Sequence, residues 1–411
     1  MKIVIIGGGP AGITVAETLC RYNFKAEIDV FSAEPYPPYS PPALSEYLLT
    51  GRDYHLWRGS EYPGKLGIVY RPGTVVAAVM PNKKAVQLAD GTQISYDHLV
   101  LASGSRLFAP VEGENQKGFY NLKSLSSVEE MLHHIRTGDA KTAIVIGAGF
   151  IGAEIGLTLA EMGLQVTQLV RSRILRTILD DELSLLIERI MEDHGIKILR
   201  GADHDAIGFV GEPRVYGVKT QRGDIIKADL IVAATGMRPN IEYLQGSGIA
   251  IDTGVIVDER MRTNLPDISA AGDVVTVPDL VTGKHYVHGN FSNALAQAQI
   301  VACDIMGWDV SYAGAENMNS LKHLGIPMIV AGNMDGEEIR VQNKDAIRKL
   351  YLHNNHIIGF RLVGDIRCAG IFRSLMNRKY DVTPFRDNLL DRSFGIGYLE
   401  EIAASPALWQ T

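Results

Sequence analysis

The sequence predicts an α/β protein with two doubly wound dinucleotide-binding domains, one inserted in the other, followed by a C-terminal α+β domain. Two glycine turns, at 7–12 and 147–152, each follow an apolar run and open a helical stretch. Later in each unit an apolar run ends in Ser-Gly or Thr-Gly, at 99–104 and 230–236. Beyond residue 316 the sequence has no such turn, and alternating apolar stretches indicate a small antiparallel sheet.

Size and composition are those of a globular protein with two or three domains: 411 residues, 46% hydrophobic and 21% charged. A net charge of −7 argues against a general nucleic-acid binder. No apolar run is long enough to span a bilayer, and a strand that starts at residue 2 leaves no room for a signal peptide. The three cysteines, Cys20, Cys303 and Cys368, lack metal-ligand spacing. We therefore expect a cytoplasmic protein without a metal or iron–sulfur cluster of its own.

The first glycine turn contains the residue types that a dinucleotide site needs. Gly7 permits the tight turn, Gly9 lets a pyrophosphate approach the backbone, and Gly12 lets the helix pack against the strand. Pro10 and Ala11 complete the turn. The phosphates are expected at the free amide donors where the helix begins.

Further candidates follow along the first unit. Glu34 comes after the apolar run 28–31, close to the spacing at which an acidic residue holds the ribose hydroxyls. The proline-rich loop 35–45 is either a rigid connector or a stiff wall beside a cofactor. Asp90-Gly91 predicts a hairpin, and the strand 99–101 then ends in small residues that permit close approach of a ligand, Ala102, Ser103 and Gly104.

The second unit repeats this order. A helical stretch at 127–135 precedes the strand 143–146, and a long amphipathic helix is expected at 181–194. The turn between strand and helix contains Gly147, Gly149, Phe150, Ile151 and Gly152. The strand 165–170 ends without a carboxylate, and Arg171, Arg173 and Arg176 follow it. These arginines are either ligands of a 2′-phosphate or solvated surface charges.

Two later motifs add candidate residues. The segment 263–274 delivers one carboxylate, Asp273, directly after Gly272, and the alternative is that it caps a helix. The segment 288–294 opens an apolar helix that runs to about residue 306, with Phe291 at its start and Ser292 as its expected cap. In the C-terminal region, stretches at 326–331, 346–353 and 357–363 predict antiparallel strands, with Asn354-Asn355 as a hairpin turn. Helices are expected at 371–378 and near the C-terminus.

In combination these motifs resemble the FAD-dependent pyridine nucleotide oxidoreductases, most of all their rubredoxin and ferredoxin reductase branch. The resemblance spans nearly the whole chain, and it rests on the segments 7–12, 147–154, 234–240, 270–273, 348–350 and 359–365. It implies an FAD-binding domain at 1–112 and 237–315, an NAD(P)-binding domain at 113–236 and a C-terminal interface domain at 316–411.

The same resemblance implies a role for each candidate residue. The first glycine turn would bind the FAD pyrophosphate, Glu34 the adenosine ribose and Asp273 the ribityl or phosphate side. Ser103 and Gly104 would line the FAD path, and Ser45, Ala102, Gly236 and Gly272 are further candidates for cofactor binding. The second turn and Arg171 would bind NAD(P)H, and Glu154 would accept a hydrogen bond from the nicotinamide carboxamide. Phe291 would lie near the flavin, and Glu154 and Phe291 are the expected catalytic residues.

Two departures from the family pattern bear on the chemistry. The disulfide members of the family carry a redox cysteine pair after the first helix, and other members carry a single cysteine near residue 43. The segment 39–45 of this chain has no cysteine, so thiol chemistry is disfavoured. Pro41 and Glu46 stand where ferredoxin-reductase relatives often have arginine and lysine, and that lysine often lies beside the flavin's reactive nitrogen.

The activity implied is that of an FAD-dependent NAD(P)H:acceptor oxidoreductase that exchanges electrons with an iron–sulfur protein or subunit. The chain also resembles the FAD subunit of 2-oxoacid:acceptor oxidoreductases of the phenylglyoxylate dehydrogenase type. It would then be a homodimer or a subunit of a larger complex. Two alternatives stay open: an NAD(P)H oxidase that reacts with oxygen, and a non-catalytic FAD-bearing scaffold that senses NAD(P)H.

Overall fold

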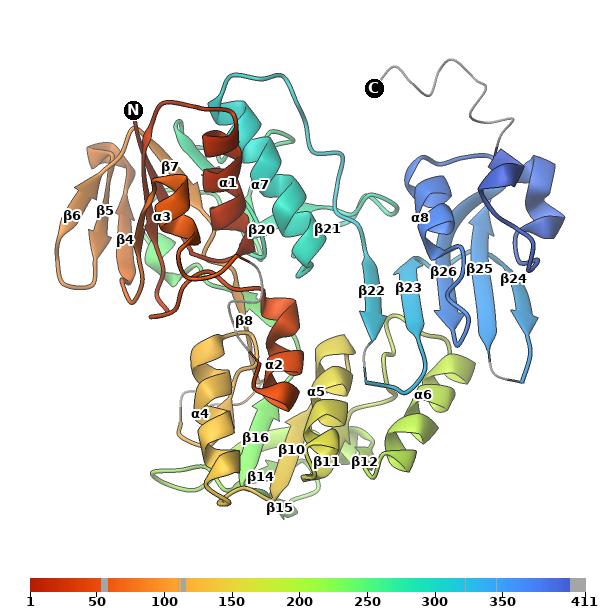
Figure 1. Ribbon diagram of the computed structural model, residues 1–411. Helices are drawn as coiled ribbons and strands as arrows, with labels where there is room; N and C mark the ends of the chain where they lie inside the picture. Colours follow the sequence, from red (N-terminus) through yellow and green to blue (C-terminus); the bar gives the residue numbers. More distant parts are fainter. Residues whose placement is uncertain (53–57, 110, 112–115, 322, 345, 400–411) are drawn as a thin grey trace.

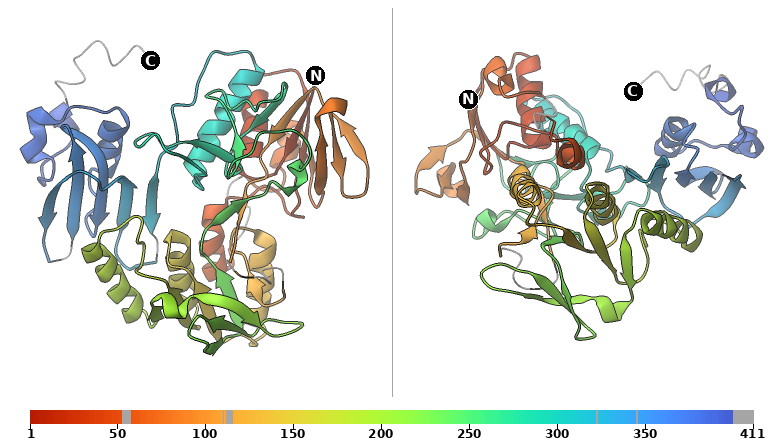
Figure 2. Two further views of the ribbon diagram at one scale, coloured as in Figure 1. Left: turned by 180° about the vertical axis from the view of Figure 1, so that it is seen from behind. Right: turned by 60° about the horizontal axis from the view of Figure 1, so that its bottom comes forward.

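A computed structural model describes residues 1–52, 58–109, 111, 116–321, 323–344 and 346–399 of the protein. Figure 1 shows a parallel sheet with helices α1 and α7, a second parallel sheet beneath it, and an antiparallel sheet beside both. The two further views in Figure 2 show the same three bodies. The predicted α/β class with two dinucleotide-type units is therefore confirmed. Within the ranges described, no helix is long and apolar enough to cross a membrane.

The first sheet has five parallel strands in the order β19-β7-β1-β2-β3. Their bounds are β1 Lys2–Ile6, β2 Glu27–Phe31, β3 Val69–Arg71, β7 His98–Leu101 and β19 Ile268–Ala270. Strand β1 is a continuous apolar run because both faces of a parallel sheet are buried, and Ile3, Val4 and Ile5 are fully buried. Helices α1 (Pro10–Arg21) and α7 (Phe291–Ile305) pack against each other beside this sheet (Figure 1).

The second sheet is also parallel, in the order β12-β11-β10-β16-β9. Its strands are β9 Phe119–Tyr120, β10 Thr142–Ile146, β11 Gln165–Val170, β12 Lys197–Arg200 and β16 Leu230–Ala233. The helices of this unit are α4 Leu125–Arg136, α5 Phe150–Glu161 and α6 Asp181–Asp193. The order β16-β10-β11 repeats the order β7-β1-β2 of the first sheet. The repeat predicted from the two glycine turns is therefore confirmed in the topology.

The chain passes from the first unit to the second and back again through two strands that lie side by side. Strands β8 (Ser105–Leu107) and β17 (Met237–Pro239) pair antiparallel, one leading out of the first unit and one returning to it. We propose the domain bounds 1–112 with 237–315, 113–236 and 316–411, of which the bound at 112–113 lies outside the described residues.

The smaller elements are β4 Val76–Met80, β5 Ala85–Leu88, β6 Gln93–Ser95, β13 Ala206–Val210, β14 Gly217–Thr220, β15 Ile225–Lys227, β18 Val255–Ile256, β20 Val275–Pro278, β21 His285–Tyr286, α2 Leu44–Thr50 and α3 Tyr62–Leu66.

The C-terminal sheet is antiparallel, in the order β22-β23-β26-β25-β24, and α8 (Ala369–Asn377) packs on it. Its strands are β22 Met318–Leu321, β23 Met328–Gly332, β24 Glu337–Gln342, β25 Ile347–His353 and β26 His356–Val363. The three predicted strands and their turn are confirmed, since Asn354 and Asn355 have φ angles of 49° and 59°. Strands β22 and β24 were not predicted, because both are sheet edges and β24 is mostly exposed and charged.

The C-terminal domain docks on both nucleotide-type units. Glu316, at its start, accepts hydrogen bonds from Arg373 (2.6 and 2.7 Å), while the Glu316 backbone pairs with Asn293 of α7. On the other side, Lys349 Nζ lies 2.7 Å from Asp180 and 2.8 Å from Glu182, at the start of α6. The C-terminal domain thereby holds the loop that leads into α6.

Lys349 and the carboxylates of Asp180, Glu182 and Glu338 form one charged cluster. Removing the buried Lys349 ammonium should weaken the docking of the C-terminal domain on the second unit. In Lys349→Met the carboxylates of Asp180, Glu182 and Glu338 would lose their common partner. Because they are about a third exposed, we expect a loss of about 2 kcal/mol, below the range for a fully buried pair. Urea unfolding at neutral pH measures this loss, with the exposed Lys227→Met as control.

The pH dependence of this cluster has a defined sign. Burial opposes ionisation of Asp180, but hydrogen bonds from the Leu183 amide and Lys349 hold its pKa below the ordinary value. Hydrogen bonds from Lys349 and then Arg340 likewise lower the pKa of Glu182. Groups with lowered pKa contribute stability above their unfolded pKa and lose it as the pH falls. The difference between the native chain and Lys349→Met should therefore shrink below about pH 4; a difference that stays constant down to pH 3 would contradict this role.

Candidate functional site

The first glycine turn leaves free amide donors at the start of α1. Gly9 is the N-cap and has no side chain to cap the helix, Pro10 follows it, and the first turn has no acidic residue. A Cβ on Gly7 would lie 2.0 Å from the carbonyl oxygen of Ala102, and one on Gly12 would lie 2.0 Å from that of Gly7. A Cβ on Gly9 would meet no described atom within 4 Å. The turn therefore combines tight internal packing with an open face of N–H groups, which fits a pyrophosphate.

The second turn has the same construction at the start of α5. Gly149 is an N-cap without a capping side chain. A Cβ on Gly147 would lie 2.5 Å from the carbonyl oxygen of Ala234, and one on Gly152 would lie 2.5 Å from that of Gly147. Phe150 and Ile151 begin the helix. The chain thus has two separate turns that fit a dinucleotide pyrophosphate.

Three other long helices differ from α1 and α5 because a side chain caps the N-terminus of each. Ser124, Asp180 and Asn290 accept hydrogen bonds from first-turn amides of α4, α6 and α7. The sequence-based choice of Ser292 as the cap of α7 was wrong. Asn290 accepts from the Ser292 amide at 2.9 Å, and the Ser292 hydroxyl itself donates to Asn290 at 2.6 Å. By contrast, α1 and α5 begin at bare glycines and keep their first amides available for an anion.

Asp273 lies against the first turn, together with a lysine that the sequence analysis missed. Gly272 adopts a φ of 87°, and a Cβ there would lie 3.0 Å from Cβ of Ala11. Asp273 accepts a hydrogen bond from the Ser105 hydroxyl at 2.9 Å and forms an ion pair with Lys123. Lys123 lies in the plain segment 121–124, which matches no motif. Only the folding of the second unit onto the first brings it to this carboxylate.

The exit of β7 is tied to the segment that returns from the second unit. The Ser103 hydroxyl donates to the backbone carbonyl oxygen of Asn240 at 2.8 Å. The side-chain amide of Asn240 donates in return to the backbone carbonyl oxygen of Ser103 at 2.9 Å. Gly104 has a φ of 68°, and Gly236 lies beside Phe108. The predicted residues after β7 thus form part of the junction between the two units.

Glu34 follows β2 as expected, but protein donors already hold its carboxylate. One oxygen accepts from the amide and hydroxyl of Ser126, both at 2.9 Å, and the other accepts from the hydroxyl of Tyr39. Burial, and then the neighbouring Glu34, raise the pKa of Tyr39, so this phenol stays a donor. Glu34 therefore fixes the proline-rich loop against α4, and a ribose hydroxyl would share the carboxylate with these donors.

Glu154 and Ser45 meet across the two units. The Ser45 hydroxyl, on α2, donates to the Glu154 carboxylate, on α5, at 2.6 Å. Glu46, the residue after Ser45, is exposed. Gly289, two residues before α7 begins at Phe291, lies close to Asp273, because a Cβ on Gly289 would be 3.6 Å from the Asp273 carboxylate. The two catalytic candidates, Glu154 and Phe291, therefore come from opposite units.

Neither Arg171 nor the cysteines stand at this junction. Arg171, at the end of β11, lies 3.3 Å from Asp205 in an exposed ion pair. Cys20, Cys303 and Cys368 are all free thiols. Burial raises the pKa of Cys20 and of Cys303, which opposes the thiolate that redox chemistry needs.

Comparison with known proteins gives a consistent result. The family model for pyridine nucleotide-disulphide oxidoreductases matches residues 1–297. Rhodocoxin reductase of Rhodococcus erythropolis is 33% identical over 319 residues, which are 76% of this chain and 74% of that protein. The epsilon subunit of NADH-dependent phenylglyoxylate dehydrogenase of Aromatoleum evansii is 26% identical over 412 residues, 96% of each chain. The crystal structure of a ferredoxin reductase of Rhodopseudomonas palustris superposes with a TM-score of 0.86, at 26% identity, and covers 98% of this chain and 100% of that one.

Proposed function

Because the chain belongs to the pyridine nucleotide-disulphide oxidoreductase family and is an FAD-dependent NAD(P)H oxidoreductase, we propose that it exchanges electrons with an iron–sulfur protein or subunit. The observation that carries this proposal is the junction itself. Each unit has one bare-glycine turn, the Ser45–Glu154 hydrogen bond joins helix α2 of the first unit to helix α5 of the second, and none of the three cysteines takes part in that contact. Without a thiol relay, electrons have to leave from the flavin directly to an outside acceptor.

We assign the first turn, Ala102, Ser103, Gly104, Gly272 and Asp273 to FAD. Gly7, Gly9 and Gly12 with Pro10 and Ala11 present amides to the pyrophosphate. Lys123 sets the position of Asp273 through their ion pair. Glu34, Ser45 and Gly236 remain proposed parts of the same site. The assignment is supported by the packing of Gly7 against Ala102 and of Gly272 against Ala11, which brings the ends of β1, β7 and β19 together at one edge of the first sheet.

We assign the second turn and Glu154 to NAD(P)H. Hydride exchange with nicotinamide and release of single electrons are chemistry that FAD supplies when bound. The residues of this chain bind the two cofactors and orient them. The Ser45 hydroxyl fixes one Glu154 oxygen, and the other stays available to accept from a carboxamide N–H. Phe291, at the start of α7, closes the opposite side and helps to exclude water.

We infer the partner class from the relatives. Ferredoxins carry iron–sulfur clusters, and one structural neighbour is a ferredoxin reductase. The phenylglyoxylate dehydrogenase relative covers almost the whole chain and is a subunit, which supports a subunit role here as well. We propose that the chain works in the cytoplasm, in agreement with its free cysteines, as a homodimer or within such a complex.

The acceptor can be identified by rapid mixing. Enzyme reduced anaerobically with NAD(P)H is mixed either with a ferredoxin or with air-saturated buffer. We expect ferredoxin to reoxidise the flavin faster by about tenfold or more, a barrier difference of about 1.4 kcal/mol. Reoxidation by oxygen at the steady turnover rate would instead support an NAD(P)H oxidase, and slow reoxidation by both would support the non-catalytic scaffold.

A further inference from the structure

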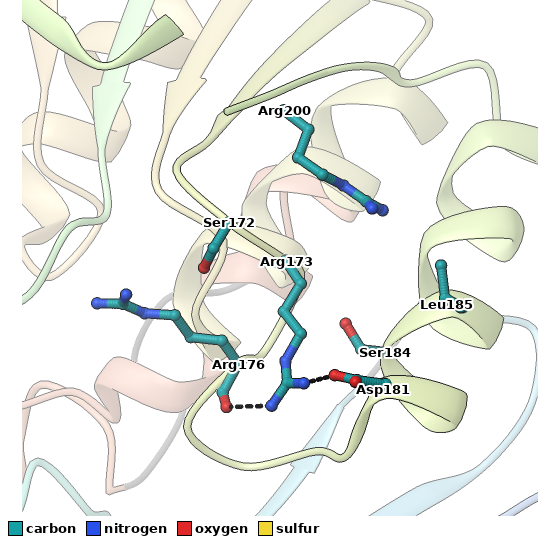
Figure 3. Close-up of a pocket in the computed structure, with 7 residues that line it drawn as sticks. All are labelled: Ser172, Arg173, Arg176, Asp181, Ser184, Leu185 and Arg200. Carbon is teal, nitrogen blue, oxygen red and sulfur yellow. Dashed lines mark hydrogen bonds and ion pairs between the residues drawn. The ribbon is translucent and has the colours of Figure 1, made fainter. Parts of the chain in front are cut away.

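A basic pocket adjoins the second glycine turn, and two of the three arginines that follow β11 line it, Arg173 and Arg176. It has a volume of about 580 Å³ and lies between the end of β11, the end of β12 and the start of α6. Figure 3 shows Arg173, Arg176 and Arg200 around it, with Ser172 at one side and Asp181 at the other. Three arginines and one carboxylate give its wall an excess of positive charge.

Backbone contacts fix where this pocket lies relative to the glycine turn. The amide of Leu175 donates to the carbonyl oxygen of Ala148, inside the turn, at 2.7 Å. Strand β11 pairs directly with β10, and the amide of Gly201 donates to Val170 at 2.9 Å. The residue that ends the second strand of such a unit meets the adenosine ribose. Here that residue is Val170, which is buried and carries no carboxylate for ribose hydroxyls.

The arginines divide into two groups. Arg173 is committed to the protein: it donates to the carbonyl oxygens of Arg176 (3.0 Å) and Leu179 (3.1 Å) and pairs with Asp181. Arg200 is paired with Glu188. Over the described ranges, the Arg176 guanidinium and the Ser172 hydroxyl have no hydrogen-bond or ion-pair partner, and both residues are exposed. Figure 3 shows the Arg176 guanidinium pointing away from the Arg173–Asp181 pair.

We propose that this pocket binds the 2′-phosphate of NADPH, with Arg176 and Ser172 as its donors, and that the protein prefers NADPH to NADH. The proposal rests on the assignment of the second turn to NAD(P)H. A guanidinium presents two parallel N–H groups to a phosphate, and the serine hydroxyl adds a third donor. Arg173 is a positioning residue that shapes the loop carrying both. Arg171 could add a further positive charge, because its exposed ion pair with Asp205 is weak and could be replaced by an ion pair with the phosphate.

Binding of two probes tests the proposal without turnover. Calorimetry with the FAD-loaded full chain compares adenosine 2′,5′-bisphosphate with adenosine 5′-monophosphate, which differs from it only by lacking the 2′-phosphate. We expect the 2′-phosphorylated probe to bind about tenfold tighter or more. Arg176→Met should weaken binding of the 2′-phosphorylated probe by about tenfold or more and change binding of adenosine 5′-monophosphate by less than about twofold. Ser172→Asp should weaken it at least as much, because an exposed carboxylate repels the phosphate without disturbing the core.

The control and the contrary outcomes are clear. Arg378→Met removes the same charge from an exposed position in the C-terminal domain and should change neither affinity. Equal affinity of the native chain for the two probes, or an unchanged preference in Arg176→Met, overturns the proposal. Rapid flavin reduction by NADH with equal probe affinities would overturn this inference but leave the proposed function standing. Failure of both dinucleotides to reduce the flavin would instead defeat the proposed function.

Discussion

Replacing Gly9 with valine is expected to give a folded protein that binds FAD more weakly and is purified with less of it. A side chain at this position meets no described atom within 4 Å, so the protein itself should tolerate it. The side chain would instead occupy the open face that a pyrophosphate must reach. Overpacking of this kind costs about 1–3 kcal/mol, so the affinity for FAD should fall by roughly 5- to 150-fold. Visible flavin absorbance per chain after purification, with circular dichroism as the test of folding, measures the effect.

Two matched glycine variants make this result specific. Gly149→Val places the same side chain at the second turn, where a Cβ also has no described neighbour within 4 Å. It should keep the yellow colour and lose the use of NAD(P)H. Gly64→Ala, in α3, has equally open surroundings and should change neither. Loss of flavin from Gly149→Val with retention in Gly9→Val would reverse the assignment of the two turns.

Replacing Glu154 with alanine is expected to impair flavin reduction by NAD(P)H while FAD stays bound. The substitution removes the acceptor proposed for the nicotinamide carboxamide and the partner of the Ser45 hydroxyl. A hydrogen bond to a charged group contributes about 1.5–3 kcal/mol, so kcat/KM for NAD(P)H should fall by about 10- to 150-fold. Stopped-flow reduction with flavin content measured in parallel gives both quantities.

Conservative variants separate the carboxylate's role from general disruption. Glu154→Gln keeps one carbonyl oxygen as an acceptor and should retain part of the activity. Ser45→Ala leaves the carboxylate in place without its fixed donor, so its loss should be smaller than that of Glu154→Ala. The exposed Glu192→Ala on α6 should behave as the native chain. Equal loss of FAD and of NAD(P)H in Glu154→Ala would contradict the separation of the two sites.

The parts predictable from the sequence are those set by neighbouring residues. Both glycine turns, the hairpin at Asn354-Asn355 and the core strands follow from local backbone needs and from apolar runs. The repeat of the two units was visible because each turn and its matching strand recur in the same order. The α/β class and the two dinucleotide-type units could therefore be predicted without a structure.

The parts that escaped prediction depend on contacts between distant segments. Lys123 reaches Asp273 only because the second unit folds back onto the first, and no pattern in the sequence marks it. Glu34 has the expected spacing, but its bonds to Tyr39 and Ser126 come from tertiary packing. Ser45 and Glu154 were each predicted, while their mutual hydrogen bond was not. The edge strands β22 and β24 were missed because exposed edges lack the apolar alternation of a core strand.

An anaerobic titration of the purified protein with NADPH and with NADH tests the central claim most directly. The claim is that one chain holds two dinucleotides, one at each glycine turn, and moves electrons between them without a thiol. We predict one flavin per chain, whose visible absorbance is lost on addition of about one equivalent of reduced nucleotide. The same titration after alkylation of the free cysteines should give the same result. A colourless chain that takes up no FAD, or a flavin reduction abolished by alkylation, would contradict the account.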